Sequence, residues 1–269
     1  MNNFNKTDKT LLLILVYFLI MVIFLIYTLC NRRRRSHDHK ERKKINPRGD
    51  HLTIACLVIC TESRPRWKME KKLWQETRVP SNVDVYILDC DDINNDLDCV
   101  ESFSPGIYQK SLQAFRMAVQ KKYDLYIRTN ANTHIDFEMI NQMGHPLKQQ
   151  IKSCDPFYTG GFIFEWGISG TSITLNHAAA SKLVQRGFDH KYYHAKYPDD
   201  VAIANVLKDV GILPTQNKGF AMHVWNHRND FQSNDTARVR NNAPFVRIRD
   251  VSLSKERSIR RHLENIPKG

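Results

Sequence analysis

Stretches of apolar residues predict three strands in the first half of residues 51–269. The run 51–60 (HLTIACLVIC) is almost continuously apolar and rich in β-branched residues, which is typical of a strand buried on both faces. Residues 83–88 (VDVYIL) and 125–128 (LYIR) have the same character. Polar or helical segments separate the three runs, so we expect each strand to be joined to the next by a crossover.

Helical patterns fill the intervals between these strands. Residues 66–76 form one candidate helix, and apolar side chains recur at helical spacing along residues 108–119, behind a capping Ser104 followed by Pro105. Asn176 is expected to cap a further helix, and residues 198–211 form another. The alternation predicts an α/β domain with a mainly parallel sheet and helices on both faces. Ligands of such sheets bind beyond the carboxyl ends of the strands.

An uninterrupted apolar stretch precedes this domain. Residues 11–29 contain no charge, and at about 1.5 Å rise per residue they nearly span a hydrocarbon core of about 30 Å. The stretch is longer than the apolar part of a signal peptide and lacks a small-residue cleavage site. We therefore expect a short tail (1–10), a retained transmembrane anchor (11–30), a basic stem (31–50) and one domain (51–269).

Charge is concentrated beside the anchor. The chain of 269 residues has a net charge of +12, of which residues 31–50 carry +6 and the 219 residues after them only +5. This distribution, and the lack of a nucleic-acid-binding motif, argues against nucleic acid as a partner. The basic stem favours a cytosolic domain by the positive-inside rule and is suited to contact with anionic lipid.

Four polar clusters are candidates for chemistry. Asn130 and Asn132 follow the third predicted strand, where two amide oxygens two residues apart can reach one ion or one ribose-diphosphate; a plain turn is the alternative. Asp89 and Asp91 follow the second strand and would suit Mg²⁺ or Mn²⁺, unless the loop is only a solvated acidic one.

The other two clusters lie later in the chain. Asp199 and Asp200 stand at a predicted helix start, where one carboxylate can cap the helix, a role that suits Asp199, and the other can act as a general base. His223 and His227 are potential metal ligands, although a lone histidine is more often an ordinary core or surface residue.

Taken in order, these segments resemble glycosyltransferases of the GT-A fold, in particular the fringe and β-1,3-galactosyltransferase group. The segments that carry the resemblance are LTIACLVIC with the basic helix up to Trp74, YDLYIRTNANTHID, the glycine-rich YTGGFIFEWG, ISGTSITLN, and YPDDV followed by IANVLKDVGI. They cover much of residues 52–225. The stretch YDLYIRTN is also similar to a less studied group of transferases found in large DNA viruses and microbes.

The resemblance implies a Rossmann-like GT-A domain that transfers a sugar, with inversion, from a nucleotide-sugar donor to a hydroxyl of a glycan or glycoprotein. A UDP-sugar is the expected donor. Asp200 would be the base, and Asp199 would orient it or cap the helix. The other residues that the resemblance places at the donor are Arg66, Lys71, Arg128, Thr129, Asn130, Asn132 and Gly170.

The resemblance also implies a divalent cation, with Mn²⁺ expected. Asn130, Asn132 and His223 would be its ligands, with Asp89, Asp91 and His227 as alternatives. The family has aspartates where this chain has Asn130 and Asn132, and neutral ligands hold such an ion weakly. A metal held mainly by donor phosphates, a metal-independent enzyme that uses Arg128, and a site completed by the two aspartates all remain open.

Two consequences concern the whole protein. The family arrangement, an anchor followed by a stem, implies a type II protein of ER or Golgi-type membranes, or of host or virus membranes if the chain is viral. This orientation conflicts with the one that the positive-inside rule favours. The Asn-x-Asn motif also leaves a second function open, a catalytically inactive GT-A domain that binds carbohydrate or serves as a structural membrane protein.

Overall fold

The computed structural model describes residues 51–60, 65–88, 104–225, 243–249 and 252–265. The chain divides into two compact units, Met1–His51 and Leu52–Gly269, and the second contains nearly all the described residues. The predicted tail, anchor and stem therefore lie outside the described part of the chain. Within that part, no helix has the length and apolar character needed to cross a membrane.

The main sheet of Leu52–Gly269 has five strands in the order β2-β1-β3-β8-β5. Three neighbouring strands, β2, β1 and β3, are parallel, whereas β8 is antiparallel to both of its neighbours. The bounds are β1 Ile54–Ile59, β2 Val83–Leu88, β3 Leu125–Asn130, β5 Tyr158–Thr159 and β8 Ile173–Asn176. The sheet is thus mixed rather than wholly parallel: β2, β1 and β3 form a parallel half, and β8 runs against the other four strands.

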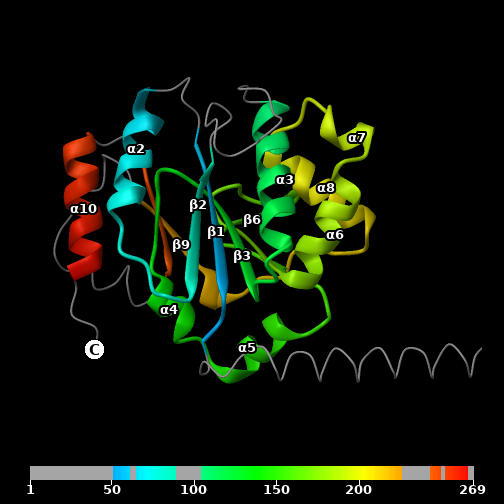
Figure 1. Cartoon of the computed structure of the whole chain (residues 1–269), viewed down its shortest axis with the longest axis horizontal. Helices are drawn as coiled ribbons and strands as arrows, with labels where there is room; N and C mark the ends of the chain where they lie inside the picture. The colour runs from blue at the N-terminus through cyan, green and yellow to red at the C-terminus, as the bar shows by residue number, and fades with distance from the viewer. Residues whose placement is uncertain (1–50, 61–64, 89–103, 226–242, 250–251, 266–269) are drawn as a thin grey trace, which may run out of the picture. The chain divides into compact units, whose positions relative to one another are not determined.

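Helices cover both faces of this sheet (Figure 1). Helices α3 (Gly106–Val119), α6 (His177–Gly187) and α8 (Asp199–Asp209) pack on one face, where their apolar side chains meet Ala55, Leu57 and Ile59 of β1. On the other face Ile54, Cys56 and Val58 meet side chains of α2 (Pro65–Glu76), α4 (Phe137–Asn141) and α5 (His145–Lys152). The alternation along β1 explains its uninterrupted apolar sequence, because both of its faces are buried.

Smaller elements complete the unit. Strands β4 (Thr133–Ile135), β10 (Phe245–Ile248) and β9 (Met222–Trp225) form a second sheet in the order β4-β10-β9. Strands β6 (Ile163–Phe164) and β7 (Gly167–Ile168) form a hairpin. The remaining elements are α7 (His190–Tyr193), the 3₁₀ turn η1 (Lys218–Phe220) and α10 (Leu253–Asn265). Helix α10 lies beside α2 (Figure 1).

The pattern-based expectations hold for most of these elements. The strand at 83–88 has the predicted bounds, and the Asn176 side chain caps α6 by accepting from the N–H of Ala179. The prediction that Ser104 caps α3 is wrong. The helix begins at Gly106 after Pro105, and the Ser104 hydroxyl instead donates to the carbonyl oxygen of Tyr197, 2.9 Å away.

Candidate functional site

The carboxyl edge of the parallel strands carries most of the predicted site residues. Strand β3 ends there at Asn130, and β5 runs in the same direction, so Gly160 follows it at the same edge. The predicted metal ligands Asp89 and Asp91 follow β2, but they lie outside the described residues, as does His227. The site is therefore built from the ends of β3 and β5, the segment before β8, and the start of α8.

Arg128 is the central residue of this edge. It lies on β3 and is 1% exposed, and its Nη2 is 2.5 Å from Oδ2 of Asp199. Its Nη1 donates to Oδ1 of Asn130 at 2.7 Å and also to the carbonyl oxygen of Gly170. Alternate residues of a strand point to the same face, which brings the side chains of Arg128 and Asn130 together. One buried guanidinium thus joins β3, the segment before β8, and α8.

Asp199 is the buried partner of this guanidinium. Burial raises the pKa of its carboxyl, and the positive charge of Arg128 opposes that rise. The expectation that Asp199 caps the helix is wrong, because α8 starts at Asp199 itself, with Pro198 in the cap position and no side-chain cap hydrogen bond. The carboxylate faces Arg128 instead, so its role is to hold that side chain in place.

Asp200 occupies a different environment one residue later. Its Oδ2 accepts from the N–H of Gly170 at 3.2 Å, and its Oδ1 accepts from the N–H of Val201 at 2.9 Å. The carboxylate is only partly buried. A Cβ on Gly170 would lie 2.8 Å from Nη1 of Arg128, so a side chain at this position would crowd the buried guanidinium. Asp200 is therefore an oriented carboxylate beside an ion pair, and solvent can reach it.

Two further polar residues strengthen the edge. Lys110 of α3 is 1% exposed, and its Nζ donates to the carbonyl oxygen of Cys60, 2.6 Å away, just after β1. The hydroxyl of Thr129 donates to the carbonyl oxygen of Thr171 at 2.7 Å, and Thr129 is fully buried. Lys110 therefore brings a second buried cation to this edge, whereas Thr129 serves to tie β3 to the strand beside it.

The predicted metal ligands do not form a cation site among the described residues. Asn130 Oδ1, the atom a metal would use, already accepts from the guanidinium of Arg128, and a divalent ion there would face a fixed positive charge. Asn132 Oδ1 is buried without a hydrogen-bond partner, and His223 lies half-buried on β9. In the ranges that the structure describes, no three histidine, cysteine, aspartate or glutamate side chains group as metal ligands would. Asn130 therefore does not suit Mn²⁺, whereas the alternative ligands Asp89, Asp91 and His227 lie outside the described residues.

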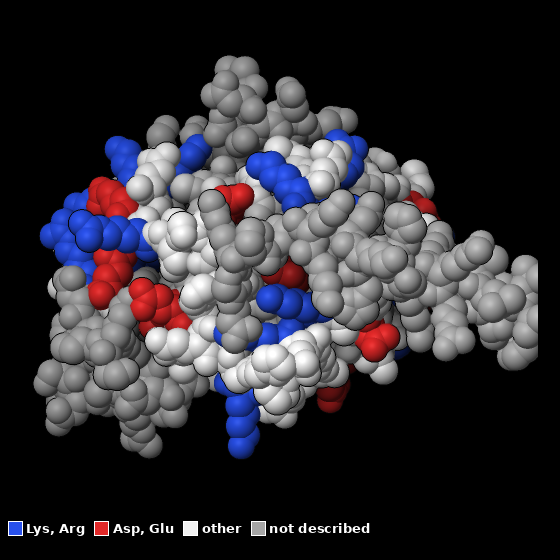
Figure 2. All heavy atoms as spheres, turned by 60° about the horizontal axis from the view of Figure 1, so that its bottom comes forward, with Lys and Arg blue, Asp and Glu red and all other residues white. Residues whose placement is uncertain are grey.

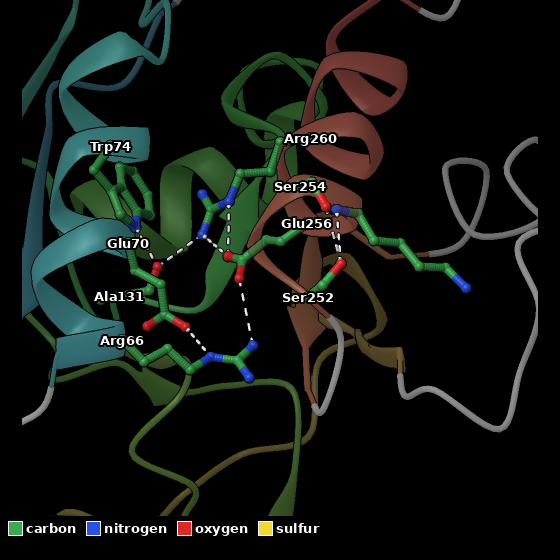
Figure 3. Close-up of polar contacts among 9 residues, drawn as sticks. Arg66, Glu70, Trp74, Ala131, Ser252, Ser254, Glu256 and Arg260 are labelled. Carbon is green, nitrogen blue, oxygen red and sulfur yellow. Dashed lines mark hydrogen bonds and ion pairs between the residues drawn. The ribbon is translucent and has the colours of Figure 1, made fainter.

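A second ionic cluster lies between α2 and α10, close to Ala131 (Figure 3). Glu70 and Glu256 are fully buried, and Arg260 is 3% exposed. Arg66 lies 2.8 Å from Glu70 and 3.4 Å from Glu256, while Arg260 Nη2 lies 3.0 Å from Glu256. Burial raises the pKa of Glu70, and the hydrogen bond from Arg66 opposes it. We call these four residues the α2–α10 cluster.

The α2–α10 cluster holds the loop between the two asparagines. The carbonyl oxygen of Ala131 accepts from Arg260 Nη2 at 2.7 Å and from Trp74 Nε1 at 2.8 Å. The nearby His134 is buried, and burial together with the charge of Arg260 lowers its pKa to about 3. The loop is therefore fixed at Ala131 by donors from two helices that are far apart in sequence.

The structure thus separates the predicted catalytic and donor-binding residues into two groups. It brings together Arg128, Asn130, Gly170, Asp199 and Asp200. Arg66 and the half-buried Lys71 lie instead on α2, where Arg66 is bound by two glutamates. Figure 2 shows basic and acidic side chains intermingled at the end of the molecule where α2 and α10 lie.

Sequence reasoning missed the residues that brace the loop, Trp74, Glu256 and Arg260. One local signal was available, because Arg66 and Glu70, like Glu256 and Arg260, are four residues apart, the spacing that pairs opposite charges on a helix. The spacing does not reveal that the two pairs meet. Ser111 was also missed, and its hydroxyl lies 3.4 Å from Nε of Arg128.

Comparison with known proteins adds no relative. No family model matches the chain, and no curated protein matches it.

Proposed function

We propose that the domain after residue 51 is a glycosyltransferase of GT-A type that transfers a sugar from a nucleotide-sugar donor, a UDP-sugar in the first instance, to a hydroxyl of a glycan or glycoprotein. One observation carries the proposal. At the carboxyl edge of the parallel strands, Asp200 is a partly exposed carboxylate oriented by the N–H of Gly170, beside the buried pair of Arg128 and Asp199.

The arrangement suits a carboxylate that removes a proton. An inverting transfer requires a base on the acceptor hydroxyl as its oxygen attacks the anomeric carbon and the diphosphate leaves. Asp200 supports this role because its two oxygens are held by N–H groups from different segments, which sets the direction of the carboxylate. Asp199 is committed to Arg128, so the two adjacent acids have separate tasks.

The buried cations support the other half of the reaction. A diphosphate leaving group carries negative charge, and cations placed before the reaction stabilise it without reorganising. Lys110 brings positive charge to the edge where such a group would bind, and Arg128 brings guanidinium N–H groups whose charge is balanced by Asp199. Because Asn130 does not suit a divalent ion, we expect turnover of the donor to persist in EDTA.

The proposal is tested by presenting the purified full chain, in detergent, with a panel of nucleotide-sugars. Thermal stabilisation by one donor, together with release of its nucleotide, would support the proposal, and parallel samples with Mn²⁺ and with EDTA test the metal expectation. If no donor or nucleotide stabilises the protein in either condition, the proposed glycosyltransferase activity is wrong. The inactive carbohydrate-binding domain would then be the better account.

We further propose that residues 11–30 anchor this domain to a membrane. The sequons at Asn5 and Asn234 flank that stretch, so only one of them can face a glycosylating compartment. Glycan on Asn234 supports the type II orientation, and glycan on Asn5 supports a cytosolic domain. Asn→Gln substitution at each position identifies which one is modified.

A further inference from the structure

The β6–β7 hairpin exposes an unusual number of aromatic side chains. Phe162, Ile163, Phe164 and Trp166 are each 38 to 47% exposed. The rings of Phe164 and Trp166 stack, with centroids 4.9 Å apart and planes 13° from parallel. The ring centroid of Phe162 lies 6.4 Å from that of Phe164. Contiguous exposed apolar surface of this kind generally marks a binding site. We call Phe162, Phe164 and Trp166 the aromatic platform.

The platform is held rigidly against the elements of the candidate site. A Cβ on Gly167 would lie only 2.4 Å from Cβ of Ala204, so the hairpin presses closely on α8, the helix that carries Asp200. The N–H of Ser169 donates to the carbonyl oxygen of Phe162 at 3.0 Å, and the next residue, Gly170, donates to Asp200. The hairpin is therefore continuous with Gly170, the residue whose N–H orients the carboxylate of Asp200 on α8.

A groove of about 990 Å³ runs along the base of the hairpin. Phe162 and Ile163 are among its lining residues, together with Gln216, Asn217 and Lys218. Among the described residues, the lining includes two amide side chains and one lysine but no carboxylate. Amides hydrogen-bond neutral hydroxyl groups as donors and as acceptors. The groove begins where β5 ends, at the same edge of the sheet as Asn130.

We infer that the aromatic platform and this groove bind pyranose rings of a neutral glycan, which serves as the acceptor of the proposed transfer. The C–H face of a pyranose is apolar and matches the electron-rich face of an aromatic ring, while its hydroxyls require partners such as Gln216 and Asn217. Calling the glycan the acceptor rests on the proposed function. The binding of the glycan rests on the hairpin and groove alone.

One residue favours a glycan over a lipid bilayer as the occupant. Glu165 lies exposed at the tip of the hairpin, between Phe164 and Trp166. Inserting this tip into an interface would bring a carboxylate toward anionic headgroups, which interfacial segments avoid by carrying lysine and arginine instead. A hydrated glycan has no such conflict with a charged neighbour.

The test uses the full chain in detergent with lactose, N-acetyllactosamine and chitotriose as probes. Saturation-transfer NMR should show contact between the protein and the ring protons of at least one saccharide. Trp166→Ala and Phe164→Ala should weaken that binding at least tenfold, whereas Trp166→Tyr retains most of it. Val79→Ala is the matched control, because Val79 is equally exposed but lies in the turn after α2.

Three results would overturn the inference: no saccharide binds, binding survives Trp166→Ala, or brominated lipid in nanodiscs quenches tryptophan fluorescence in the unaltered chain but not in Trp166→Phe. The last result would assign the hairpin to the membrane instead. Nucleotide-sugar turnover on the same samples separates the two proposals. Donor turnover without saccharide contact at the hairpin defeats this inference alone, and saccharide binding without any donor turnover defeats only the proposed function.

Discussion

Two buried ionic clusters contact the loop of Asn130 and Asn132, and they differ in charge balance. The α2–α10 cluster contains two arginines and two glutamates, so its formal charges cancel. In the second cluster, Arg128 is paired with Asp199, and Asp200 adds a second carboxylate that is held by backbone N–H groups. The first cluster is balanced in charge and braces Ala131. The second leaves one acid available for chemistry.

This difference distinguishes ion pairs that stabilise the domain from charged groups that are available for a reaction. A buried charge must be compensated, so a balanced network indicates a structural role. A surplus carboxylate that solvent can reach, next to a satisfied pair, indicates a group kept for another purpose. The following predictions test this division, beginning with the largest expected effect.

Replacing Arg128 should damage stability most. Arg128→Met leaves Asp199 buried without its cation, and breaking a buried pair in this way typically costs about 3–5 kcal/mol. Urea unfolding of the full chain in detergent measures the loss. The double variant Arg128→Met with Asp199→Leu should recover part of it, because no buried charge remains. A loss below about 1 kcal/mol for the single variant would show that the pair is not structural.

Arg260→Met should be destabilising to a smaller extent, by about 2–4 kcal/mol, because Arg66 still faces both glutamates. The variant also removes one of the two donors to Ala131. Arg257→Met is the matched control, since Arg257 lies on the same helix but its ion pair with Glu76 is about half exposed. Equal effects for the two variants would contradict a structural role for the α2–α10 cluster.

His134 should make the protein acid-sensitive. Its pKa in the folded protein is lowered from 6.5 to about 3. Between these pH values the unfolded chain therefore binds a proton that the folded chain does not bind. The neutral, buried His134 therefore contributes its full share to the free energy of unfolding above pH 6.5. This contribution decreases by about 1.4 kcal/mol per pH unit as the pH falls toward 3.

Between pH 6.5 and pH 5 the free energy of unfolding should fall by about 2 kcal/mol. Unfolding curves measured at intervals over that range should show the decline in the unaltered chain and a flatter profile in His134→Gln, which does not titrate. Parallel profiles for the two proteins would mean that His134 is not held neutral by its burial.

The smallest effect is expected at the surface of the same helices. Glu76 is the ion-pair partner of Arg257, with Oε1 3.5 Å from Nη2, and its side chain is 56% exposed. Glu76→Gln should therefore change the free energy of unfolding by less than about 1 kcal/mol. High salt should reduce the effect further by screening. A loss comparable to that of Arg260→Met would erase the distinction between the buried cluster and its exposed neighbour.

Local patterns predicted much of the main sheet because the relevant signals are local. Alternate packing of β1 on two cores explains its continuous apolar run, and the cap at Asn176 was predicted from its residue type. The site was predicted less well where partners are distant. Arg66 was predicted to contact a donor phosphate, but its guanidinium instead donates to Glu256, which lies 190 residues later in the sequence. For Asn130 the signal was present, since Arg128 lies two residues earlier on the same strand face.

The central claim is that Asp200 acts as the base, and Asp200→Asn tests it most directly. The amide keeps the shape of the side chain and one of its two acceptor oxygens, but it cannot take a proton. With the donor identified by the screen, turnover should fall by about 10²–10⁴-fold, the usual contribution of a general base. Donor affinity and melting temperature should stay within error of the unaltered chain, with Asp155→Asn, an exposed acid elsewhere, as control. Full turnover in Asp200→Asn would contradict the account.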